Sequence, residues 1–384
     1  MSRALSPPIR TPAGTHAART RALLEAPIVP TLLRLATPTV LVTMVQASVI
    51  TLDAYYVGRL GPEALAGVSL VFPLFMLMQT MSAGGMGGGV ASAVARALGA
   101  GRRADADALA WHAVGIAVAM AGAFTVGIVG SGAALYRALG GSSTVVDVAI
   151  AYSNVIFGGA LAYWLLNTLG SIVRGSGNMI LPAAVMVAGA VVYAALAPAL
   201  LAGRGPLPAL GVRGPAAANI VAAGLGALVL LAYLCSPRSL VRLSLRGLRP
   251  RWACFREILR VGAPGSLNTV LTNLTVVLLT ALAAPFGSPA LAGYGMAARL
   301  EYLLIPLVFG FGSALVTMVG TNVGAGHRAR AERIAWIGAG LAAALTGSVG
   351  LGAALAPEVW MRLFTADADA VAAGSTYLRI VGPT

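Results

Sequence analysis

Long apolar runs dominate this sequence and restrict what the chain can fold into. A helix of about 20 apolar residues is long enough to cross the roughly 30 Å hydrocarbon layer of a membrane. Nine such runs are complete, at residues 34–57, 64–92, 109–135, 148–172, 180–202, 214–235, 262–284, 290–320 and 333–356. A tenth begins near Ala370 and continues to Thr384. Only 10% of the 384 residues are charged, whereas soluble domains carry about 25%. The sequence therefore predicts an all-α polytopic membrane protein with nine complete spans and the start of a tenth.

The arginines mark one side of this predicted membrane protein. Every basic residue other than histidine is arginine, and these residues gather in alternate loops: before residue 34, at Arg102 and Arg103, at Arg174, across 236–261, and at 328–333. Cytoplasmic loops of membrane proteins carry the excess of Lys and Arg. We therefore expect a cytoplasmic N-terminus in a bacterial inner membrane. The formal net charge of +14 is then a signal of topology, and no nucleic-acid partner is expected.

An internal repeat divides the chain. Pro38 and Pro264 each open an apolar run, and with the same offset of 226 residues 61–67 overlay 287–293. One residue out of step, 99–104 overlay 324–329. The offset contains six spans, so both copies enter the membrane from the same side, as in transporters built from parallel repeats. The full fold would then be two lobes of six helices each. We expect a disordered cytoplasmic tail (1–33), an N-lobe (34–235), an Arg-rich cytoplasmic linker (236–261) and an incomplete C-lobe (262–384).

Asp53 is the most informative polar residue, because it lies inside the first apolar run. A charge at the centre of a membrane helix costs about 2.5–3.5 kcal/mol on insertion scales, so such residues usually face a cavity or a partner. Asp53 lies in the outer half of its span, where pairing with Arg59 is one explanation. The other is a wet cavity, because Gln46 lies seven residues earlier, two helical turns away on the same face. The residues alone leave both readings open.

Other polar residues fall inside predicted spans. Arg299 and Glu301 lie two residues apart and do not face each other on a helix, so each is expected to pair with another span. An interhelical ion network and a part in substrate binding both remain possible for them. Further candidates to line a cavity are Tyr163, Trp164, Asn167, Thr272 and Asn273.

The stretch from Ser82 to Gly89 is rich in glycine, but no Gly-Lys-Ser/Thr follows it as a phosphate-binding loop requires. Gly84 with Gly88 and Gly85 with Gly89 instead form overlapping GxxxG pairs, which favour close packing of membrane helices. We therefore expect this stretch to be a helix contact.

Several motifs in order resemble those of the multidrug and toxic compound extrusion (MATE) family. They are Asp53 followed by Val57, Gly58, Leu60 and Gly61, then Arg96 to Gly101, Arg174 to Asn178, Gly211 to Gly214, and Met318 to Gly326. The resemblance implies a secondary active transporter, not an enzyme, that exports cationic or amphipathic compounds by antiport with H⁺ or Na⁺. It also implies that Asp53 is the cation-coupling residue and the place of any bound Na⁺. Tyr193 and Ala197 depart from the family's Asn-x-x-x-Asp pair, which leaves the coupling ion open.

Competing interpretations remain at this point. A lipid-linked oligosaccharide flippase of similar two-lobe architecture is one, and a non-functional transporter fragment is another, because the predicted C-lobe is short. A flippase is expected to need a strongly cationic cavity, whereas Arg299 is the one clear cation inside the predicted spans. We expect a monomer in the lipid bilayer that handles a small, cationic substrate, with no cofactor beyond the coupling ion and no metal site beyond that Na⁺.

Overall fold

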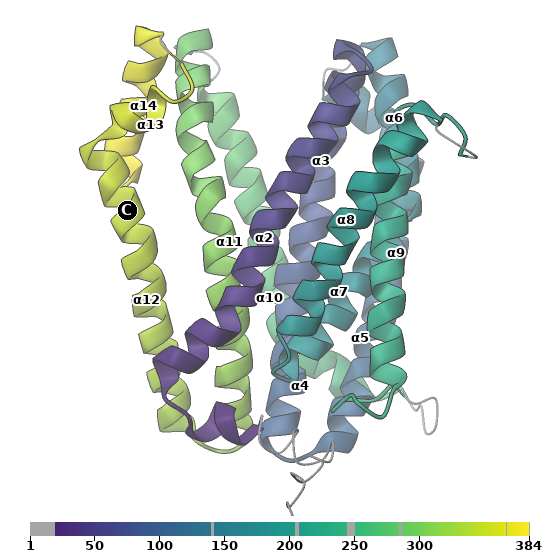
Figure 1. Ribbon diagram of the computed structural model, residues 1–384, viewed down its shortest axis with the longest axis vertical. Helices are drawn as coiled ribbons and strands as arrows, with labels where there is room; N and C mark the ends of the chain where they lie inside the picture. Colours follow the sequence, from purple (N-terminus) through teal and green to yellow (C-terminus); the bar gives the residue numbers. More distant parts are fainter. Residues whose placement is uncertain are drawn as a thin grey trace, which may run out of the picture.

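The structure of the protein, a computed structural model, describes residues 20–139, 142–203, 207–243, 250–283, 286–365 and 367–383. Within these ranges every regular element is a helix, which confirms the predicted all-α membrane class (Figure 1). The first half contains α2 (Ile28–Gly58), α3 (Pro62–Thr80), the π-helix η1 (Met81–Gly85), α4 (Met86–Gly99), α5 (Arg103–Ala138), α6 (Ser143–Gly158), α7 (Ala160–Gly175), α8 (Ile180–Ala202) and α9 (Arg213–Cys235). The second half contains α10 (Trp252–Ala283), α11 (Ser288–Gly324), α12 (Arg328–Leu355), α13 (Pro357–Met361) and α14 (Ala368–Val381).

In the described part of the chain, seven helices are long and apolar enough to cross a membrane, or eight if one bent pair counts as a single span. That pair is α6 and α7, which together correspond to the predicted span 148–172 and meet at an angle of 44°. Gly159 lies at the break. A Cβ added there would overlap the side chain of Ile220 on α9, so the absence of a side chain at Gly159 lets α9 pack closely. The predicted total of nine spans stays a prediction, since the run 262–284 lies in α10, which is not one of the seven.

The helix ends repeat the internal duplication. Gly61 and Gly287 precede equivalent helices and have φ values of 113° and 93°, a region that glycine adopts without steric cost. Gly101 and Gly326 follow the ends of those helices with φ values of 73° and 82°. The amide after each of these two glycines donates a hydrogen bond of 2.9 Å to a carbonyl of the preceding helix, Arg102 to Ala97 and His327 to Asn322. This is the bond of a Schellman cap. Equivalent turns thus have equivalent geometry.

Helices begin before two of the predicted domain boundaries, those at residues 33 and 261. The tail was predicted to reach residue 33, but residues 20–25 are helical and α2 already begins at Ile28. Leu23 and Leu32 explain the difference, because both are buried against α11 and α12. The linker was predicted to reach residue 261, but α10 begins at Trp252. Residues 1–19 lie outside the described ranges.

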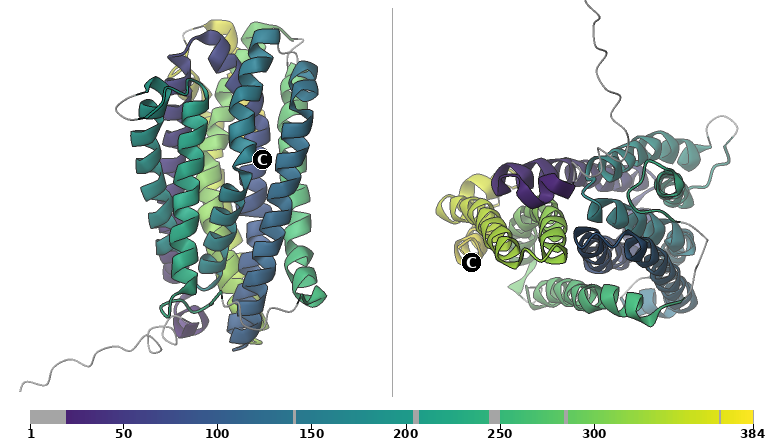
Figure 2. Two further views of the ribbon diagram at one scale, coloured as in Figure 1. Left: turned by 90° about the vertical axis from the view of Figure 1, so that its right-hand side faces the viewer. Right: turned by 90° about the horizontal axis from the view of Figure 1, so that it is seen from below.

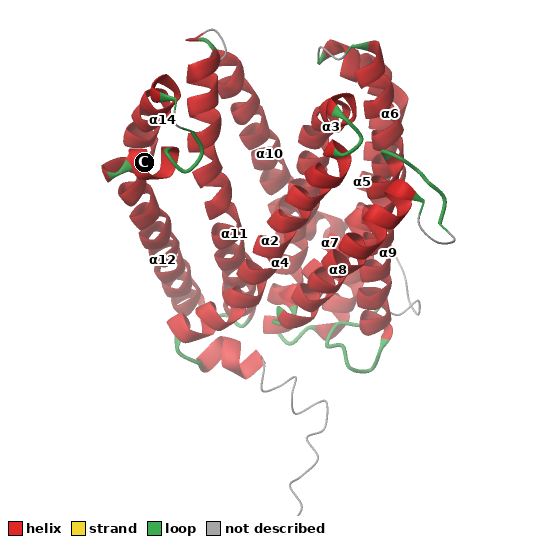
Figure 3. Cartoon of the chain, turned by 45° about the horizontal axis from the view of Figure 1, so that its top comes forward, coloured by secondary structure: helices red, strands yellow, loops and turns green. Residues whose placement is uncertain are grey.

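The two halves join at one end of the molecule. We call this the arginine-rich end, because Arg102, Arg103, Arg174, Arg251 and Arg328 lie at the helix ends there. Figure 1 shows α11, α12 and α14 standing apart from α3 and α6 at the opposite end, and Figure 3 shows the same separation from a tilted view. Helix α2 crosses between the halves, packing first on α11 and later on α8. Seen from below in Figure 2, α10 lies beside the first-half helices.

Glycines allow this junction. A Cβ on Gly85 would lie 2.7 Å from the Cα of Ser266, and one on Gly89 would lie 2.7 Å from the Cα of Gly262. The second of the two predicted GxxxG pairs therefore packs α10 against η1 and α4. The first pair does not, because a Cβ on Gly88 would meet nothing within 4 Å.

Candidate functional site

Asp53 lies in the upper part of α2, where two tyrosines hold its carboxylate. The phenol of Tyr193 on α8 donates a hydrogen bond to Oδ1 at 2.5 Å. The phenol of Tyr152 on α6 donates to Oδ2 at 3.3 Å. Each carboxylate oxygen thus has one neutral donor, contributed by a different helix.

The packing of α2 on α8 fixes this geometry. Tyr193 is 1% exposed and Tyr152 is 4% exposed, whereas Asp53 is half-buried. Val49 and Leu52 of α2 pack on the small apolar cluster that contains Tyr193. The tyrosine rings therefore supply apolar contact while their hydroxyls reach the acid, as buried tyrosines commonly do.

The arrangement suits a carboxylate that gains and loses a proton. A phenol can donate one hydrogen bond and can also accept one. The tyrosines can therefore hold an ionised Asp53 by donating to it, and can accept from its O–H once it is protonated. No ion pair among the described residues involves Asp53, so pairing with Arg59 is not seen. Gln46 lies half-buried two turns earlier on α2.

The candidates on α7 have different surroundings. Tyr163 is buried and packs edge-on against Phe75 at a centroid distance of 5.3 Å. Trp164 is fully buried against Phe124 in the first-half core, so the structure gives it a packing role. Asn167 is also buried, and its amide donates to Gln79 at 3.2 Å and to Ser82 at 2.8 Å. Asn167 therefore ties α7 to the second span.

Of the second-half candidates, those whose side chains the structure describes make no hydrogen bond to Asp53. The Thr272 hydroxyl donates to the carbonyl of Asn268 and the Asn273 amide to that of Thr269, so both bond within α10. Arg299 is exposed and its guanidinium lies 5.4 Å from the ring centre of Phe364, a cation–π contact. The side chain of Glu301 lies outside the described part of the structure.

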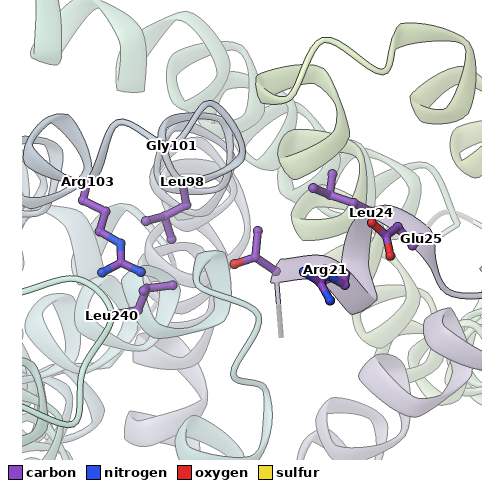
Figure 4. A pocket seen from close by; sticks show the side chains of 8 residues that line it. Arg21, Leu24, Glu25, Leu98, Gly101, Arg103 and Leu240 are labelled. Carbon is purple, nitrogen blue, oxygen red and sulfur yellow. The ribbon is translucent and has the colours of Figure 1, made fainter. Parts of the chain in front are cut away.

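A pocket of about 340 Å³ opens at the arginine-rich end, far along α2 from Asp53. Figure 4 shows Leu98, Arg103 and Leu240 on one wall and Arg21, Leu24 and Glu25 on the other. Arg21, Glu25 and Arg103 are exposed, so this is a solvent-facing hollow and not part of the Asp53 site.

Sequence reasoning missed Tyr152 and the Asn167 partners Gln79 and Ser82. Tyr152 could have been found as a phenol inside the apolar run 148–172. An acid such as Asp53 inside one membrane helix needs hydrogen-bond donors from another helix. Tyr193 was found only as a departure from a family motif, yet it makes the shorter of the two contacts to Asp53. Its neighbour along the helix face, Ala197, is fully buried. Among the described residues, no group of three or more His, Cys, Asp or Glu side chains is arranged to hold a metal ion.

Comparison with known proteins agrees with this architecture. Residues 38–199 and 264–384 match the MatE family. A probable multidrug resistance protein NorM of Thermotoga maritima is 27% identical over 353 residues, which cover 91% of this chain and 75% of that protein. An FAD transporter of Shewanella oneidensis is 28% identical over 316 residues, 81% of this chain and 69% of that protein. The structure of a multidrug resistance MATE family transporter of the MOP superfamily, in an outward-facing conformation, superposes with a TM-score of 0.82 at 27% identity, covering 94% of this chain and 80% of that one.

Proposed function

Since the chain belongs to the MatE family and is therefore a multi-pass membrane transporter and not an enzyme, we propose that it exports cationic or amphipathic compounds by antiport, with Asp53 as the coupling residue. The supporting observation is the half-buried carboxylate of Asp53, held by Tyr193 and Tyr152. A proton and a cationic substrate compete for one such carboxylate, because protonation makes the acid neutral and removes the negative charge that attracts the cation, while a bound cation favours the ionised form. That competition is sufficient to link entry of one to release of the other.

The coupling ion that this proposal favours is the proton. Tyrosine hydroxyls can bond to both the ionised and the protonated acid, so protonation needs little rearrangement. A Na⁺ ion would need several oxygen acceptors around it, yet the two contacts to the Asp53 oxygens are O–H donors directed at the carboxylate. The proposed setting is a monomer in the bacterial inner membrane with its arginine-rich end in the cytoplasm, as the positive-inside rule favours.

The test is export of a cationic dye from proteoliposomes under an imposed pH gradient or an imposed Na⁺ gradient. Asp53→Asn is compared with Glu63→Gln, an exposed acid in the first turn of α3. We expect the pH gradient to drive export by the parent chain and by Glu63→Gln, and Asp53→Asn to abolish it. Equal export by all three chains would remove Asp53 from the mechanism. Export driven by Na⁺ alone would overturn the assignment of the proton but leave the role of Asp53 intact.

A second substrate class has one observation in its favour. The Shewanella relative is an FAD transporter, and FAD is a large, anionic dinucleotide. Counterflow of labelled FAD in the same proteoliposomes tests this alternative. Exchange of FAD in the absence of any dye export would favour it over the cationic class.

A further inference from the structure

His112 joins the two halves through a pair of hydrogen bonds that define its protonation state. Its Nδ1 lies 2.7 Å from the carbonyl oxygen of Ala108, and its Nε2 lies 2.8 Å from the backbone nitrogen of Arg251. A carbonyl oxygen only accepts and a backbone amide only donates. Nδ1 therefore carries the proton and Nε2 accepts, so His112 is neutral in this structure.

The amide that His112 accepts from lies directly before α10, which begins at Trp252. The first amides of a helix have no partner within the helix, and the imidazole supplies one. The ring of Phe255, one turn into α10, packs edge-on against the imidazole at a centroid distance of 4.7 Å. His112 is 6% exposed, so loss of this acceptor would leave the amide facing a buried site.

We propose that His112, Arg251 and Phe255 form a proton-sensitive clasp, a set of contacts that holds the start of α10 against α5 while His112 is neutral. Protonation turns Nε2 into a donor that faces another donor. It also places a positive charge beside the helix N-terminus, where the backbone dipole is already positive. Both effects act in the same direction and release the start of α10.

The charged side chains around His112 are carboxylates and guanidinium groups, which do not ordinarily titrate in the same pH range as histidine. Asp105 on α5 already pairs with Arg102 at 3.0 Å and with Arg251 at 3.6 Å. Charged groups near this end also include Arg103 and Arg328 at helix ends, Asp107, which accepts from the Arg242 amide, Glu257 with Arg96, Arg174 with Ser171, and Arg256 and Arg260 of α10. Asp147 and Glu63, on the other helices packed against α5, lie near the opposite end. Carboxylates and guanidinium groups ordinarily keep their charge from about pH 5 to 8, the range in which histidine titrates.

One further titratable group, Cys254, lies at the start of α10. Burial raises the pKa of the Cys254 thiol, so it stays neutral through the same range. Of the side-chain types in this set, imidazole is the one that ordinarily titrates in that range. Release of the start of α10 would also affect the contact between the two halves, because α10 packs on η1 and α4 at Gly85 and Gly89.

The test needs no variant for its first part. The chain has three histidines, and ¹⁵N spectra of histidine-labelled protein in lipid report which ring nitrogen carries the proton. We expect one histidine with a protonated Nδ1 and a bare Nε2 at neutral pH, and we expect that signal to be missing from His112→Gln. A His112 signal with a protonated Nε2 at neutral pH would overturn the proposal.

The second part measures amide exchange of residues 251–255 between pH 5 and 8, corrected for the intrinsic rate. Loss of one hydrogen bond predicts a fall in protection at Arg251 on the order of 10-fold at the acidic end. His112→Gln keeps an acceptor that does not titrate, so its protection should be independent of pH. His112→Phe lacks the acceptor and should exchange fast at every pH. Protection in the parent chain that does not change with pH, or the same pH response in His112→Gln, would refute the clasp.

Discussion

A close backbone contact between the halves gives the sharpest quantitative prediction, for Gly324→Ala. A Cβ on Gly324 would lie 2.8 Å from the carbonyl carbon of Arg96 and 2.9 Å from its Cα. Non-bonded carbon atoms are in favourable van der Waals contact at about 3.5–4.0 Å. The atoms that the new Cβ would meet belong to the backbone of Arg96 and cannot rotate away. Helix α11 must therefore move off α4 by on the order of 1 Å.

Overpacking of this kind typically costs about 1–3 kcal/mol. The cost falls on the arrangement in which the arginine-rich end is closed, because that is where α4 and α11 touch. If the transporter exchanges between arrangements closed at opposite ends, the substitution shifts the equilibrium away from the one described by about 5–150-fold. We expect the ratio of molecules with the arginine-rich end open to those with it closed to rise by this factor.

The assay is a spin-label distance measurement across the arginine-rich end in proteoliposomes. Labels at Ala104→Cys and Ala329→Cys, exposed and equivalent in the two repeats, report the separation in a background with Cys235→Ala and Cys254→Ala. Gly324→Ala should add a population at longer distance. Gly88→Ala is the matched control, because the added methyl meets nothing within 4 Å. If both variants give the distance distribution of the parent, the glycine contact does not set the equilibrium.

Two further predictions concern the first half. Tyr193→Phe should lower gradient-driven dye export by about 10–100-fold, because a hydrogen bond to a charged group is worth about 1.5–3 kcal/mol. Tyr152→Phe should lower it less, because the Tyr152 contact is 3.3 Å and that of Tyr193 is 2.5 Å; equal effects would count against the geometry. Asn167→Ala should destabilise the protein by about 1–3 kcal/mol, because it removes donors to Gln79 and Ser82 in a buried setting. Thermal unfolding in detergent measures this, with exposed Asn154→Ala as the control; the same melting temperature for both would contradict the importance of the buried network.

The helical class and the duplication could be predicted from the sequence because both are carried by local patterns. Apolar length gives the spans, and the glycines at 61 and 287 have the same backbone conformation because they do the same local task. The boundaries at residues 33 and 261 could not be predicted in this way. Leu23 is buried by helices that lie about 300 residues later, and local hydropathy contains no record of such contacts.

The same limit applies to the candidate site. Asp53 stands out because a carboxylate in an apolar run is costly wherever it points. Its partners do not stand out, because Tyr152 and Tyr193 are ordinary residues for a membrane helix until the fold brings them together. Trp164 and Asn167 lie on one helix within a few residues of each other, yet the first packs in the core and the second forms a polar network. Only the neighbouring helices decide which.

The junction of α4 and α11 is symmetric in its details. Gly99 lies on the backbone of Thr321, and Gly324 lies on the backbone of Arg96, with the same distances of 2.8 and 2.9 Å from the added Cβ to the carbonyl carbon and Cα. Gly99 corresponds to Gly324 and Arg96 to Thr321, so the contact has the form of the self-complementary interface of a two-fold homodimer. A single repeat could build it with a second copy of itself. Joining the two copies in one chain frees each side chain to change alone. Asp53 of the first repeat corresponds to Leu279 of the second, so this acid belongs to one half of an otherwise symmetric scaffold.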